Sequence, residues 1–124
     1  HGISHHQSDP EKLEKLYKIN LYHMKLVAYY LDKLNRTPDG AGTLLDQTLT
    51  MFACSMSDSN DHLLQNLPVV LAGGRPEQIK TGRHIRFPEA TPISNLYWTL
   101  LDKLGVPIEK FGNSEAKVGL LPLA

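Results

Sequence analysis

The sequence predicts an α/β fold, because two helical patterns enclose two short apolar segments of strand length. Apolar residues recur at helical spacing near the start of the chain and again near its end. The segments between them, 49–54 and 68–72, are bounded by polar residues or glycine, as buried strands are. With 124 residues, 41% of them hydrophobic and 21% charged, the chain has the composition and the length of one soluble globular domain.

The longest predicted element is an amphipathic helix over residues 9–35. Ser8 is the expected N-cap, Glu11 stands at the capping-box position, and a proline is tolerated in the first turn. The apolar stripe of this helix consists of Leu13, Leu16, Tyr17, Met24, Val27, Leu31 and Leu34, and it is widened by Ile19, Leu26 and Tyr30. Asn20 and His23 interrupt the stripe, and we expect them to be satisfied interior polar groups rather than ligands.

The middle of the chain contains both predicted strands. Residues 49–54, Leu-Thr-Met-Phe-Ala-Cys, run directly into a polar segment, and Cys54 is expected to be a small buried side chain. The second strand, 68–72, stops at two consecutive glycines. After a loop, Thr91 and Pro92 open a second, C-terminal helix, which Gly105 closes.

Two or three strands are fewer than a sheet of usual size contains, and both apolar runs resemble strands that are buried on both faces. We therefore expect residues 1–124 to be the C-terminal portion of a single larger α/β domain. The missing elements would come from an N-terminal half of the same protein or from another protomer.

Charge and hydropathy exclude some classes of partner. The formal net charge is zero, with 13 basic and 13 acidic residues, so the electrostatic basis for binding nucleic acid is absent. No apolar run reaches about 18 residues, so no membrane span is expected. A single cysteine can supply neither an internal disulfide nor a cysteine-based zinc site.

Three of the six histidines lie in the first six residues. His1 and His5 stand four apart, the spacing that places two imidazoles on one face of a helix, and His6 is expected to face a different partner. A purification tag would not be interrupted by Gly-Ile-Ser as this segment is. Solvated histidines without a role are the other alternative.

A second polar cluster, 58–62, follows the first predicted strand and contains Asp58, Asn60, Asp61 and His62. Carboxylates and an imidazole at the carboxyl end of a strand lie where open α/β sheets place their sites. The alternative is an ordinary turn, because Ser-Asp-Ser-Asn-Asp is also typical of a chain that leaves a strand.

The opening residues 1–6, His-Gly-Ile-Ser-His-His, resemble the His-x-x-Ser-His-His motif of a family of exported bacterial proteins of unknown function. The resemblance continues in order through 9–12, 44–46, 57–58, 66–69, 72–74 and 82–84. It implies export to the periplasm or cell surface. It also implies an additional N-terminal half, which members of that family have.

The order of elements is similar to the C-terminal half of the alkaline-phosphatase-like superfamily of metal-dependent hydrolases and phosphomutases. In that superfamily an Asp-x-x-x-His pair precedes a long helix, a strand ends in Ser/Ala-Asp-His-Gly, and a later histidine precedes the next strand. Here His1 and His5 have the first spacing, Asp58 ends the first strand, and His62 lies six residues before Pro68. The chain differs at His1, where the superfamily has aspartate, and at Ser59, where it has a histidine of the second metal.

This resemblance implies a nitrogen-rich metal site formed by His1, His5 and His62, which suits zinc or a similar divalent ion. Asp58 would be its neighbour or a ligand of a second ion. The leading hypothesis is a fragment of a metal-dependent hydrolase-like protein for phosphate or sulfate esters, not active alone. The alternatives are a non-catalytic binding or scaffold protein that retains the fold, which Ser59 favours, and an α/β domain whose histidines are incidental.

Overall fold

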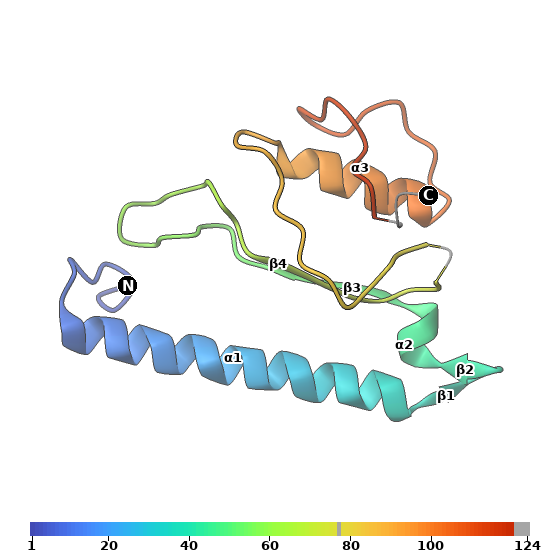
Figure 1. Cartoon of the computed structure of the whole chain (residues 1–124). Coiled ribbons are helices and arrows are strands. Elements are labelled where there is room, and N and C mark those ends of the chain that lie inside the picture. The colour runs from blue at the N-terminus through green and yellow to red at the C-terminus, as the bar shows by residue number, and fades with distance from the viewer. Residues whose placement is uncertain (77, 121–124) are drawn as a thin grey trace. The chain divides into compact units, whose positions relative to one another are not determined.

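The computed structural model describes residues 1–76 and 78–120, and the chain divides into two compact units, His1–Gly74 and Arg75–Ala124. The described residues form a mixed α/β structure with a long N-terminal helix, two small antiparallel sheets of two strands each, and a later helix (Figure 1). The predicted α/β class is confirmed in this general sense.

Helix α1 spans Pro10–Arg36, close to its predicted bounds of 9–35. Its N-cap differs from the prediction. Asp9, not Ser8, caps the helix, because the Asp9 carboxylate accepts hydrogen bonds from the backbone N–H groups of Glu11 and Lys12. Ser8 instead has a left-handed backbone, with φ of 61°, in the turn that leads into the helix.

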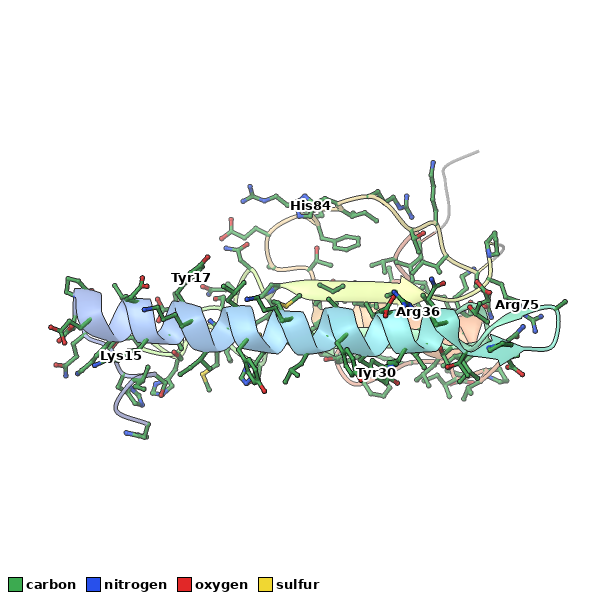
Figure 2. All side chains as sticks on the ribbon, turned by 90° about the horizontal axis from the view of Figure 1, so that it is seen from below. Lys15, Tyr17, Tyr30, Arg36, Arg75 and His84 are labelled. Carbon is green, nitrogen blue, oxygen red and sulfur yellow. The ribbon has the colours of Figure 1, made fainter. Side chains whose placement is uncertain are left out.

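The apolar stripe of α1 is largely uncovered. No residue of the helix is buried, and the least exposed apolar positions, Leu16, Val27, Leu31 and Leu34, are only half-buried. The expectation that Asn20 and His23 are interior groups is wrong, because both are exposed. Figure 2 shows side chains that project from every side of the helix, with Tyr17 and Tyr30 on different sides.

A short hairpin and a helical turn follow α1. Strands β1 (Pro38–Asp39) and β2 (Gly42–Thr43) are antiparallel, and α2 (Leu44–Gln47) begins directly after them. Thr43 and Asp46 form a reciprocal capping box at the start of α2. The backbone N–H and the hydroxyl of Thr43 both donate to the Asp46 carboxylate. These hydrogen bonds lower the pKa of Asp46, the backbone one more than the hydroxyl one.

The predicted strands are present as β3 (Leu49–Ala53) and β4 (Val69–Gly73), each within one residue of its expected bounds. They pair antiparallel, with Leu49 opposite Gly73 and Ala53 opposite Val69. All five positions of β3 are half-buried. The expectation that Cys54 is buried is wrong: the strand ends one residue earlier, and the thiol is exposed.

The second unit is built on α3 (Ile93–Lys103), the predicted second helix. Pro92 occupies its N-cap position without a side-chain hydrogen bond to the helix, and the Thr91 hydroxyl donates to the Pro88 carbonyl instead. Buried apolar side chains here come from Ile79, Leu96 and Leu120. Among the described residues, no helix is both long enough and apolar enough to cross a membrane.

Candidate metal centre

The loop that follows β3 folds into a tight turn over residues 57–63. The backbone N–H of Leu63 donates to the Asp58 carbonyl, and that of Ser57 donates to the Leu63 carbonyl, both at 2.9 Å. Within the turn, the Asp58 carboxylate oxygen Oδ1 accepts the N–H of Asn60 at 2.7 Å and that of Asp61 at 3.3 Å. The cluster therefore has the turn geometry that its composition also allowed.

The histidine-rich segment 1–8 lies against this turn, more than 50 residues away in the sequence. Ser59 Oγ donates to the Ser4 carbonyl at 3.0 Å, and the backbone N–H of Gln7 donates to Asn60 Oδ1 at 2.8 Å. These two hydrogen bonds lie on either side of His5 in the sequence, so they bring His5 next to the turn that carries His62.

Three of the four predicted ligands lie together as a result. The His5 ring lies between the other two, with its centroid 4.3 Å from that of His1 and 5.0 Å from that of His62. The His5 and His62 rings meet edge to face at 72°, and the His1 and His5 rings are tilted by 44°. His5 is half-buried, whereas His1 and His62 are exposed.

His6 has a separate environment. It is the most buried of the histidines, 8% exposed, and its Nδ1 accepts the backbone N–H of Ser8 at 3.1 Å. An accepting Nδ1 assigns the proton of the neutral ring to Nε2. That nitrogen faces Asp58, with 3.7 Å between Nε2 and Oδ1. This approach is longer than a direct hydrogen bond but close enough for electrostatic attraction.

Asp58, the fourth predicted ligand, forms hydrogen bonds within its own loop. Its Oδ1 holds two backbone N–H groups of the turn and faces His6. In this arrangement the carboxylate positions the turn that carries His62.

The chemistry of the three rings suits a borderline divalent ion, because imidazole nitrogens are preferred zinc ligands. Across residues 1–76 and 78–120, no group of three histidine, cysteine, aspartate or glutamate side chains is arranged to hold an ion. The imidazoles instead contact one another through their rings. Binding would require them to turn about their side-chain torsions until one nitrogen of each faced a common point.

The polar contacts that join the two clusters were not predicted from the sequence. Ser59 was identified only as a departure from the superfamily pattern, and Asn60 only as a member of the polar cluster 58–62, which could be a site or a turn. The Ser-Asp-Ser-Asn pattern indicates that side chains will bond to nearby backbone. It does not indicate that a segment more than 50 residues away will supply the partners.

Comparison with known proteins adds no relative: no protein-family model, no curated protein and no solved structure matches the chain.

Proposed function

We propose that this chain supplies imidazole ligands to a divalent metal site in a metal-dependent hydrolase-like protein of the phosphate or sulfate ester class. The observation that supports this most is the position of the His5 ring, between His1 and His62. Residues from distant parts of the sequence meet there, and all three carry nitrogen donors. Such donors suit zinc or a similar borderline divalent ion.

His5 and His62 are the principal ligands in this proposal, with His1 as the third and Asp58 as the group that orients the turn. A bound divalent ion supplies a Lewis acid that polarises an ester oxygen. The nucleophile and further ligands belong to an N-terminal half of the protein or to another protomer. The chain alone is therefore expected to be inactive, and the exported family that it resembles suggests a periplasmic or cell-surface location.

Zinc titration of the metal-free protein by calorimetry tests the site. We expect one zinc per chain, with affinity reduced at least about 10-fold in both His5→Ala and His62→Ala, because each removes one donor. His23→Ala and His84→Ala are matched controls, since both remove exposed histidines outside the cluster, and they should bind zinc like the wild type. Equal losses in all four variants would indicate scattered surface binding and would reject the site.

A non-catalytic binding or scaffold protein is the second candidate, and one observation favours it. Ser59 replaces a histidine of the superfamily pattern, and its hydroxyl donates to the Ser4 carbonyl. Asp58 Oδ1 accepts a backbone N–H of its own turn. Both side chains thus have structural roles. A folded protein without stoichiometric zinc binding, and without esterase activity when the N-terminal half is present, would favour this candidate.

A further inference from the structure

We propose that Ser59 and Asn60 are positioning residues, which hold segment 1–8 on the turn 57–63 and thereby set His5 against His62. This inference rests on the proposed metal site for its functional meaning, although the contacts themselves do not require a metal. It gives Ser59 a role of its own in place of the histidine that the superfamily pattern has there.

The two contacts fix the backbone on both sides of His5. The Ser4 carbonyl immediately before it accepts from Ser59 Oγ at 3.0 Å, and the Gln7 N–H two residues after it donates to Asn60 Oδ1 at 2.8 Å. A residue in a segment that is held both before and after it has little freedom to move away. The His5 ring is therefore kept within 5.0 Å of the His62 ring.

The Asn60 side chain is itself held in the required orientation. Its amide Nδ2 donates to Asp61 Oδ1 at 2.6 Å, which leaves Oδ1 to face the Gln7 N–H. Its backbone N–H donates to Asp58 Oδ1 at 2.7 Å, so Asn60 is also held by contacts within its own turn. Only an acceptor can occupy the position of Oδ1, because the partner is a donor.

Backbone conformation in segment 1–8 and in the turn 57–63 indicates that the contacts between these two segments hold them in place. Gln7 and Ser8 have φ of 51° and 61°, and His62 has φ of 53°, in the left-handed region that non-glycine residues avoid. Such conformations persist where surrounding contacts determine them. Without the bonds to Ser59 and Asn60, the chain around Gln7 and Ser8 would return to ordinary conformations and carry His5 away from His62.

The test combines a metal-free measurement with zinc titration in Ser59→Ala and Asn60→Ala. We expect both to weaken the nuclear Overhauser contact between the His5 and His62 rings in the metal-free protein, and both to lower zinc affinity about 10-fold, the effect typical of groups that orient ligands. Ser59→Thr keeps the hydroxyl and should restore both properties. Ser55→Ala is the matched control, because it removes the hydroxyl of an exposed serine in the same loop after β3, and it should change neither property.

The outcomes separate this inference from the metal site. If the wild type binds no stoichiometric zinc but the ring contact still depends on Ser59 and Asn60, the proposed function fails and the positioning role stands. If both alanine variants keep the ring contact and the zinc affinity, the positioning role is wrong and the site can remain. Should a variant unfold, hydrogen exchange of the wild type decides, because an unprotected Gln7 amide would contradict the docking contact.

Discussion

At the residue scale, Gly73 shows how closely two segments of the first unit approach. Its φ is 78°, and a Cβ at this position would lie 2.3 Å from the Thr48 carbonyl oxygen and 2.4 Å from that of Leu45. The next residue, Gly74, donates its N–H to the same two carbonyls. The glycine pair that the sequence indicated only as the end of a strand is thus where β4 meets the end of α2.

Gly73→Ala should therefore destabilise the first unit strongly. Gly40→Ala is the control in the same unit, because Gly40 also has positive φ, 59°, but nothing lies within 4 Å of its Cβ position. We expect Gly40→Ala to lower the free energy of unfolding by about 1–2 kcal/mol from backbone conformation alone. Gly73→Ala adds the collision with two backbone carbonyls, for a total above about 3 kcal/mol. Urea unfolding measures both, and equal losses would contradict the close approach.

Asp9 gives a prediction about pH. Hydrogen bonds from the backbone N–H of Lys12, and then of Glu11, lower the pKa of this carboxyl. Because the folded pKa lies below the unfolded one, the contribution of the cap to stability is fully present above about pH 4 and is lost as pH falls through the lowered folded pKa. Titration of the Asp9 carboxyl carbon by NMR should give a midpoint below the ordinary aspartate value. In Asp9→Asn the first turn should remain capped without this pH dependence, and in Asp9→Ala it should fray at neutral pH.

Single-residue roles were predicted less well than elements, for a physical reason. Ser8 and Asp9 are both good capping residues, and only the backbone conformation shows that the chain turns at Ser8 and starts its helix after Asp9. Cys54 has an apolar neighbourhood in the sequence, but burial depends on what covers the strand end. The grouping of His1, His5 and His62 was expected from spacing and resemblance, whereas the contacts that create it were not.

At the element scale, α3 holds the last part of the described chain with polar side chains. Buried Asn95 uses Oδ1 to accept the N–H of Glu115 at 2.8 Å. Thr99, 2% exposed, accepts the N–H of Val118 at 2.8 Å and donates its own hydroxyl hydrogen to the Asn95 carbonyl. Side chains of α3 thus hold the backbone of segment 115–118, which belongs to no helix or strand of its own.

Replacing Thr99 with valine tests this arrangement while keeping the side-chain shape. Thr99→Val leaves the Val118 N–H without its partner in a buried setting, so we expect the second unit to lose about 1–3 kcal/mol of unfolding free energy. Thr91→Val removes a hydroxyl that bonds at an exposed position and should cost about 0.5 kcal/mol or less. Thermal unfolding followed by the fluorescence of Trp98 reports on this unit. A Thr99→Val protein as stable as the wild type would show that the hydroxyl is not needed.

Elements with strong local signals were predicted nearly to the residue. The helix Pro10–Arg36 carries a helical repeat of apolar residues, and β3 and β4 are compact apolar runs with clear ends. The antiparallel pairing of β3 with β4 has no such signal, because register and direction depend on the path of the connecting loop. The short strands β1 and β2, two residues each, are too short to produce a period at all.

At the scale of the whole molecule, the first unit has little interior. Among the described residues of His1–Gly74, His6 is the one that is buried, and no apolar side chain there is fully covered. Large apolar side chains are exposed along α1 instead, among them Leu13, Tyr17, Leu21, Met24, Leu26 and Tyr30. Burial of apolar surface is the main term that offsets the conformational entropy lost on folding. A unit of this size with so little fully buried apolar surface would gain stability if a partner covered α1.

We therefore expect the isolated chain to self-associate through the apolar side of α1, where another protomer or an N-terminal half would pack. Tyr17 and Tyr29 test this as a matched pair, because they are 60% and 61% exposed. Tyr17 lies one turn from Leu13 and Leu21 on the apolar side, whereas Tyr29 lies one turn from Lys25 and from Lys33, on the charged side of the helix.

Tyr17→Lys should weaken self-association about 10-fold in sedimentation velocity, because it places a charge in the covered surface. Tyr29→Lys should leave association nearly unchanged, since its position among charged side chains stays in solvent. The two substitutions add the same charge at positions of equal exposure in the single chain, so a difference between them reports only on what the partner covers. Equal effects of the two substitutions would show that the chain does not self-associate through the apolar side of α1. The wild-type chain could instead stay monomeric at all concentrations and melt cooperatively. That result would show that the first unit is stable while α1 is uncovered, and it would contradict the expectation that the domain is larger than this chain.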